Sequence, residues 1–166
     1  IDYSEGTSLL LYSLEQIANF ETENVDLNAF HKVNHLMINK TGDKFIFIHR
    51  YLKKNVRFDR LLLADVRGNL LKVLADNEMV SHCCWLNENT IFAYLRGIDN
   101  IDSYYSIDIQ TGKMTLFDNS LFRKYGDGHP SSNGRFILSD SYPDKALHQH
   151  LLLYDMKSGE AKELGS

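Results

Sequence analysis

Residues 127–138 read Asp-Gly-His-Pro-Ser-Ser-Asn-Gly-Arg-Phe-Ile-Leu, a histidine at the head of a polar turn that leads into an apolar strand. The same order occurs twice more upstream, because His35, His82 and His129 are separated by equal gaps of 47 residues. After each apolar strand comes a second strand that ends in aspartate, followed by a glycine turn. A repeat of this length built from short strands predicts one β-propeller blade per repeat.

We therefore predict an all-β fold, a β-propeller fragment of about 3.5 four-stranded antiparallel blades. Complete blades are expected at residues 34–75, 81–118 and 128–165, with turns at their asparagine and glycine clusters. The chain is expected to form a single partial propeller rather than several domains.

The N-terminal part of the chain is predicted as a half blade at residues 7–20. Leu9–Leu14 aligns with Leu151–Met156, and Ile17–Phe20 would then be the outer strand. Residues 21–33 are predicted as a loop, either irregular or with one short helical turn. Closed propellers need about 4–8 blades. We thus expect a fragment whose uncovered blade faces favour self-association, in the form of a homodimer.

Composition excludes several classes of partner. The hydrophobic content of 43%, the charged content of 24% and the net charge of −4 are ordinary for a globular protein. No broad basic face is indicated, so nucleic-acid binding is not expected. The densest basic stretch, residues 50–60, is expected to be a solvated blade loop. The apolar runs are too short to cross a membrane.

The cysteines and the missing motifs narrow the chemistry further. Cys83 and Cys84 are adjacent and would point to opposite faces of a strand, so they are expected to be unbridged. Unbridged buried cysteines favour a reducing compartment, and hence a cytoplasmic over a periplasmic location. The sequence has no glycine-rich phosphate loop, no cysteine-pair metal spacing and no serine nucleophile elbow.

The third repeat resembles a known family of propellers. Residues 127–138 are similar to the His-Pro-x-Trp/Tyr-Ser-Pro-Asp-Gly-Arg signature of TolB-like propellers, and residues 80–85 fit the same pattern. Residues 139–144, followed by 151–155, are similar to oligogalacturonate-lyase-like propeller proteins. The resemblance covers about residues 33–164. The sequence departs from the signature at residues 132–134, where the turn is shorter.

The resemblance implies a metal site in the members that are lyases. These have seven blades and hold a divalent metal such as manganese through histidines and a glutamine. The complete ligand set does not map onto this chain, but His35, His82 and His129 are candidate ligands because they would head three consecutive inner strands. The alternative is that these histidines only hydrogen-bond backbone between blades.

Three other residues are candidate ligand contacts. Asp140 and Tyr142 follow an apolar strand near the blade rim, where a carboxylate could bind sugar hydroxyls and a phenol ring could stack on a sugar. Asp140 could instead stabilise a turn before Pro143. Arg50 is the third candidate. A general base for lyase chemistry would have to be another histidine or Lys145.

Two functions are therefore expected to compete. The first is a non-catalytic binding or scaffold module that recognises an oligosaccharide or a polysaccharide-related ligand. The second is an oligogalacturonate-lyase-like enzyme that carries out β-elimination with a histidine-lined divalent metal in the channel. A third alternative is the propeller of an exo-acting peptidase whose catalytic domain lies outside this chain. Fold alone does not decide among them.

Overall fold

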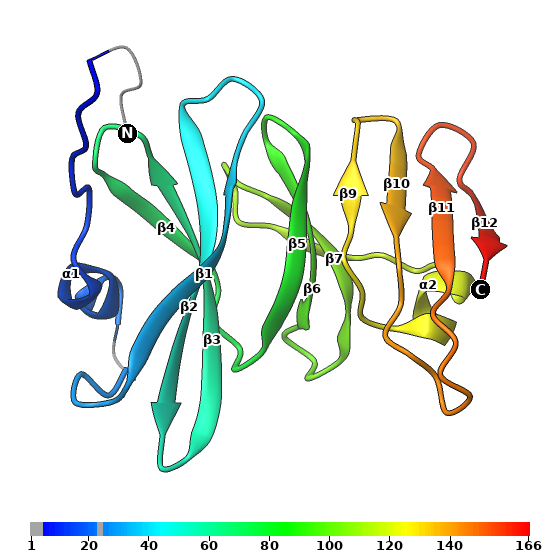
Figure 1. Ribbon diagram of the computed structural model, residues 1–166, viewed down its shortest axis with the longest axis horizontal. Helices are drawn as coiled ribbons and strands as arrows, with labels where there is room; N and C mark the ends of the chain where they lie inside the picture. Colours follow the sequence, from blue (N-terminus) through cyan, green and yellow to red (C-terminus); the bar gives the residue numbers. More distant parts are fainter. Residues whose placement is uncertain (1–4, 23–24) are drawn as a thin grey trace.

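The computed structural model of the chain describes residues 5–22 and 25–166. Three antiparallel four-stranded sheets lie side by side along the long axis of the molecule (Figure 1). The strand order in each sheet follows the chain, which is the arrangement of a propeller blade. The predicted fold class, a partial β-propeller, is confirmed.

The first blade contains β1 (His31–Ile38), β2 (Lys44–Lys53), β3 (Val56–Asp65) and β4 (Leu70–Ala75). The second contains β5 (Val80–Asn87), β6 (Thr90–Arg96), β7 (Asp102–Asp108) and β8 (Met114–Leu116). The third contains β9 (Ser131–Ser132), β10 (Phe136–Ser139), β11 (Leu151–Asp155) and β12 (Glu160–Gly165). The short helix α2 (Ser120–Tyr125) joins the second blade to the third.

Alternate residues of each strand bury against the two neighbouring layers, as the strand period of two requires. Ile46 and Ile48 of β2 pack in one cluster with Ile91 and Ala93 of β6, between the first and second blades. Phe92 on the opposite face of β6 packs in another cluster with residues of β10 and β11, between the second and third blades. Two apolar layers therefore fill the blade boundaries, one between each pair of neighbouring blades.

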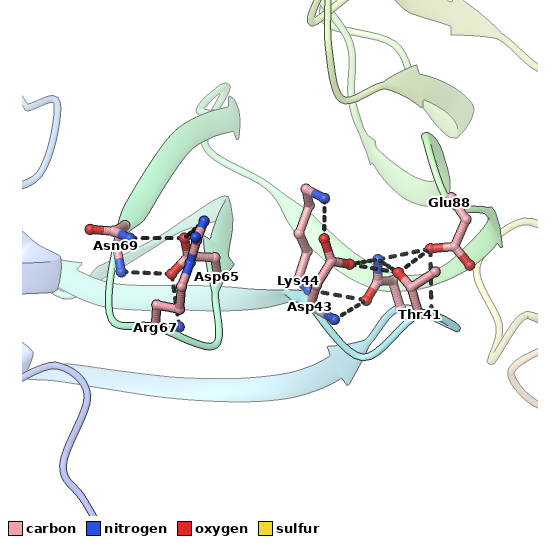
Figure 2. A network of polar contacts seen from close by, with 8 residues as sticks. Thr41, Asp43, Lys44, Asp65, Arg67, Asn69 and Glu88 are labelled. Carbon is pink, nitrogen blue, oxygen red and sulfur yellow. Dashed lines mark hydrogen bonds and ion pairs between the residues drawn. The ribbon is translucent and has the colours of Figure 1, made fainter.

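A polar contact also fixes the first blade to the second. Asn39 is buried at the end of β1, and its amide donates to Thr41, Asp43 and Glu88. Glu88 belongs to the turn after β5, and Figure 2 shows its carboxylate reaching Thr41 across the blade boundary. The two inner strands are thereby held at their ends.

The predicted half blade at residues 7–20 is wrong. In its place the chain forms the helix α1 (Leu14–Asn19), which begins at Ser13. The Ser13 hydroxyl accepts from the Gln16 backbone, and the Gln16 side chain accepts from the Ser13 backbone. This reciprocal capping box starts a helix and competes with a strand.

Helix α1 also corrects the expectation that both end faces of the propeller lie uncovered. Ile17 of the helix is 6% exposed and packs against Phe47, Leu62 and Ala64 of the first blade. The helix therefore covers part of the apolar face of that blade, while Leu9, Leu10 and Leu36 at the same end remain exposed. At the other end of the molecule, Leu138 and Leu151 of the third blade remain partly exposed.

Two further differences concern the first blade. The predicted loop at residues 21–33 ends earlier than expected, since β1 begins at His31; residues 23–24 lie outside the described part of the chain. The basic stretch is not a solvated loop. β2 and β3 continue through it to a two-residue hairpin at Lys54 and Asn55, whose φ angles are 51° and 64°. Two positive φ values are typical of a type I′ turn.

Candidate functional site

The repeated histidines lie on or just before the innermost strand of each blade. In β1 the pairing with β2 shifts register between Asn34 and Met37, and His35 adopts a positive φ of 53°. In β5 a similar shift lies between Val80 and Cys83, around His82. An irregularity of this kind redirects a side chain away from the alternation of the strand. Positive φ is uncommon for a residue other than glycine, and such strain concentrates at functional sites.

The three imidazole rings form a row across the three blades. The ring centroids of His35 and His82 are 5.0 Å apart, with the planes nearly perpendicular. Those of His82 and His129 are 4.2 Å apart. Equal spacing in the sequence thus corresponds to direct contact in space. We call this row, with the residues that bond to it, the histidine cluster.

Two carboxylates orient two of the rings. Asp127 accepts from the Ser81 hydroxyl at 2.5 Å and lies 3.2 Å from His82 Nδ1. Asp140 accepts from the backbone N–H of His129 at 2.6 Å and lies 3.0 Å from its Nδ1. A carboxylate on one ring nitrogen fixes the ring and leaves the other nitrogen for a ligand or a proton.

The structure does not place Asp140 in the local turn that was one of the two expectations, and its binding to a sugar stays a prediction. The hydrogen bonds of its carboxylate go to His129, eleven residues earlier, and not to a local turn before Pro143. Tyr142 lies beside it, with ring centroids 6.1 Å from His82 and 5.9 Å from His129. Tyr142 is 52% exposed, so one face of its ring is open to solvent.

Arg50 is placed differently from the other candidate contacts. Its guanidinium forms an ion pair with the fully buried Asp59 and donates to the carbonyl of Val80. These bonds hold β2, β3 and the start of β5 together. The positive charge nevertheless acts on His35 from a distance, as one of the causes that lower the pKa of that histidine.

The surroundings of His35 disfavour its charged form. Partial burial lowers the pKa of its imidazole, and the neighbouring His82, Arg50 and His129 lower it further. Its Nδ1 and the side-chain oxygen of Asn34 are the buried side-chain polar atoms that lack a hydrogen-bond partner in residues 5–22 and 25–166. Buried polar atoms normally have partners, so a water or a ligand group is expected to bond here.

The cluster requires a close approach of two backbone segments at Gly128. A Cβ atom at this position would lie 1.8 Å from the backbone oxygen of Asp140. Only glycine allows Asp127 and His129 to lie so near Asp140. The glycine that precedes the third histidine is thus part of the site.

The residues do not fit a metal centre as they are placed. Within the described ranges, no three histidine, cysteine, aspartate or glutamate side chains are arranged so that they could hold a metal ion. The role of His35, His82 and His129 as metal ligands stays a prediction, and we derive no step through a metal. No helix in the described part of the chain is long and apolar enough to span a membrane.

Sequence reasoning missed two members of the cluster, Ser81 and Asp127. They directly precede a repeated histidine or its glycine, in Ser81-His82 and Asp127-Gly128-His129. Their position next to the repeated histidines was the signal from which the sequence could have identified them. The bond between Asp127 and His82 joins two blades, however, and only the packed structure brings those residues together.

No protein-family model matches the sequence, and no curated protein matches it. Among solved structures, the chain is similar to puromycin hydrolase, with a TM-score of 0.57, 11% identity and 81% of this chain covered. It is also similar to a putative TolB from Agrobacterium tumefaciens, with a TM-score of 0.49, 11% identity and 82% of this chain covered. The chain spans 22% of the first protein and 62% of the second. At this identity, the likeness to puromycin hydrolase concerns the fold alone.

Proposed function

We propose that the chain is a ligand-recognition module that binds an oligosaccharide at the histidine cluster. One observation carries the proposal: the row of repeated histidines ends beside a half-exposed aromatic ring and two carboxylates that are already held in place. Binding sites in proteins combine an apolar or aromatic surface with a few fixed polar groups. Tyr142 supplies the surface, and Asp127 and Asp140 supply acceptors for sugar hydroxyls.

The charges around the cluster favour a neutral sugar over a polyuronate. Asp127 and Asp140 are both acidic, and the nearby Arg50 is already paired with Asp59. A uronate carboxylate entering the cluster would meet two like charges without a free cation to offset them. Neutral hydroxyl groups can instead donate to the carboxylates.

The direct experiment is calorimetric titration with maltohexaose, cellohexaose, mannohexaose and oligogalacturonate. We expect binding to at least one neutral oligosaccharide, weakened roughly tenfold by Asp140→Asn and by Tyr142→Ala, the loss of about one good contact each. Asp99→Asn, a change at an exposed aspartate outside the cluster, is the matched control. Equal affinity in all variants would place the ligand elsewhere, and no binding to any of the sugars would contradict the proposal.

The lyase resemblance supplies a second candidate function, β-elimination on an oligogalacturonate. In its favour, the His82–Asp127 and His129–Asp140 pairs orient imidazoles in the way that proton transfer requires. The test is to incubate the chain with oligogalacturonate, with and without added manganese, and to follow the ultraviolet absorbance of unsaturated products. Product formation that His82→Gln abolishes would support the enzyme; a flat trace under both conditions would leave binding as the function.

We further propose that the chain associates with itself through the third blade. Leu138 of β10 pairs directly with Leu153 of β11, and Leu138 is 38% exposed. The corresponding pair in the first blade, Ile46 with Leu63, is almost completely buried against the second blade. The same surface in the third blade therefore has an apolar face that favours a partner.

A further inference from the structure

A groove lies at the far end of the inner strands from the histidine cluster. It has a volume of about 590 Å³, within the range typical of small-molecule sites. The turns that follow β1, β5 and β9 all contribute to it. Its lining residues are Ile38, Lys40, Trp85, Leu86, Asn87, Glu88, Ser132, Asn133 and Gly134.

The groove follows the same repeat as the histidine cluster. Ile38, Trp85 and Ser132 are spaced by 47 residues, and each follows its repeated histidine by three positions. With a rise of about 3.3 Å per residue, the groove lies roughly 10 Å further along the strands. None of the residues that line it belongs to the histidine cluster. It is a separate site on the same three strands.

The floor of the groove is apolar and fixed. The Trp85 indole N–H donates to the carbonyl of Met37 at 2.9 Å, across the boundary between the first two blades. This bond sets the orientation of the ring while part of the ring stays exposed. Ile38 is 60% exposed beside it. A rigid aromatic ring with an adjacent aliphatic side chain makes a flat surface for another ring.

The rim carries donors whose acceptor atoms are already used. Asn87 Oδ1 accepts from the Asn89 backbone, and Asn133 Oδ1 accepts from the backbone N–H groups of Arg135 and Phe136. Their amide NH₂ groups therefore remain available as donors. The turns hold both side chains in place without using those groups.

The charges on the rim cancel. Lys40 is exposed and forms no ion pair with any residue in the described ranges, and it contributes one positive charge. Glu88 contributes one negative charge, and its Oε2 is held by Asn39 and Thr41 while its Oε1 remains as an acceptor. A rim with donors and acceptors but no net charge suits a ligand that is polar at its edge and neutral.

We infer that this groove binds a neutral sugar ring, with the apolar face of the sugar on Trp85 and its hydroxyl groups at Asn87, Asn133 and Glu88. A pyranose has both an apolar face and an edge of hydroxyls that donate and accept. The inference rests on the proposed function for the class of ligand and adds a second subsite, on a different set of residues. An oligosaccharide would gain affinity by occupying both.

The chain has a single tryptophan, so the indole N–H of Trp85 gives one isolated NMR signal that reports on the groove. The experiment titrates ¹⁵N-labelled protein with the methyl glycosides of glucose, galactose and mannose. We expect a saturable shift of the indole signal with at least one of them. Free galacturonate serves as the charged comparison, and it should shift the signal less.

Two variants test the residues at the rim. Asn87→Asp and Asn133→Asp keep the oxygen that each turn needs and replace the NH₂ donor by a charged acceptor oxygen, so both should fold. Each should weaken the sugar titration roughly tenfold. Asn28→Asp, at an exposed turn outside the groove, is the control. Unchanged affinity in both rim variants would overturn the inference.

The two sites are separable in the same spectra. Tyr142→Ala should leave the indole titration unchanged, because Tyr142 does not line the groove. If the imidazole signals of the histidine cluster move with sugar and the indole signal does not, this inference fails and the proposed function stands. If no neutral glycoside moves the indole, or only galacturonate does, the groove is not a neutral sugar site.

Discussion

At the scale of single residues, the most constrained side chain is His49, which is fully buried in β2. Arg60 Nε lies 3.3 Å from His49 Nδ1, and arginine only donates, so Nδ1 must be the acceptor. The His49 proton is then on Nε2 and points to His31 Nδ1 at 2.9 Å. His31 in turn donates through Nε2 to the carbonyl of Asp26. The hydrogen bonds run in one direction, which requires a neutral His49.

This arrangement predicts a loss of stability in acid. Burial, together with the charges of Arg60 and His31, lowers the pKa of His49 from 6.5 to about 4. Between these two values the unfolded chain binds a proton that the folded chain excludes. The contribution of His49 is therefore complete above pH 6.5 and is lost as the pH falls toward 4, by about 3 kcal/mol in total.

Urea unfolding of the wild type and of His49→Gln across this pH range checks the prediction. The free energy of unfolding of the variant should depend less on pH than that of the wild type. His148→Gln, at an exposed histidine, should behave like the wild type. Parallel pH profiles for all three proteins would show that His49 is not the group responsible.

Gly128 gives a second prediction at this scale. Because a Cβ atom would meet the Asp140 backbone oxygen, Gly128→Ala must displace one of the two segments that form the histidine cluster. We expect a cost of about 3 kcal/mol, measured by denaturant unfolding. Gly165→Ala is the matched control, since a Cβ there meets nothing within 4 Å. Similar costs for the two variants would contradict the close approach.

At the scale of elements, helix α1 shows where sequence reasoning was misled. The apolar run Leu9–Leu14 resembles β11, and that likeness predicted a strand. The capping signal Ser13-x-x-Gln16 lies directly behind it and starts a helix instead. Arg60 then donates to the carbonyls of Ile17 and Phe20 at the end of the helix. The Ile17 carbonyl also accepts from the backbone N–H of Phe20, and the Arg60 side chain adds a partner for the carbonyl groups at the end of the helix.

Removal of the cap should loosen this helix and leave the blades intact. Ser13→Ala deletes the hydroxyl that accepts from Gln16, at a typical cost of about 1 kcal/mol. Amide hydrogen exchange should become faster in α1 and stay unchanged in β5–β7. Ser8→Ala, an exposed serine outside the helix, should have no effect. Unchanged exchange in α1 would mean that packing alone maintains it.

The strands and the candidate site were predictable to different degrees. Turns at Asn133-Gly134 and the aspartate after each third strand mark the blades, because turn chemistry is local. The equal spacing of His35, His82 and His129 predicted that they lie at similar positions on three consecutive blades. The pairing of Asp127 with His82 was not predictable, because it depends on how two blades pack. For the same reason, the sequence does not reveal that Arg50 is occupied by Asp59.

At the scale of the whole molecule, the blades pack face to face, and each of the two end blades has one face without a neighbouring blade. Helix α1 covers part of the outer face of the first blade (Figure 1). The outer face of the third blade, which is the opposite face of a blade, leaves Leu138 and Leu151 partly exposed. Apolar side chains are therefore exposed at both ends of the molecule.

Self-association through the third blade is a testable outcome. Leu138→Lys introduces a charge into the exposed face and should shift the chain toward monomer in sedimentation equilibrium. Leu147→Lys is the control, because Leu147 is 83% exposed in the loop between β10 and β11. A wild-type protein that is already monomeric at tens of micromolar would contradict the proposed association.

The central claim is that the row of histidines is a ligand site, and the imidazole NMR signals test it directly. The chain has seven histidines, few enough to assign individually by substitution. On titration with the neutral oligosaccharides, we predict that the signals of His82 and His129 shift saturably and that His35 shifts with them. His31 and His49, which are hydrogen-bonded to each other, should stay in place. Shifts confined to other histidines, or none at all, would contradict the account.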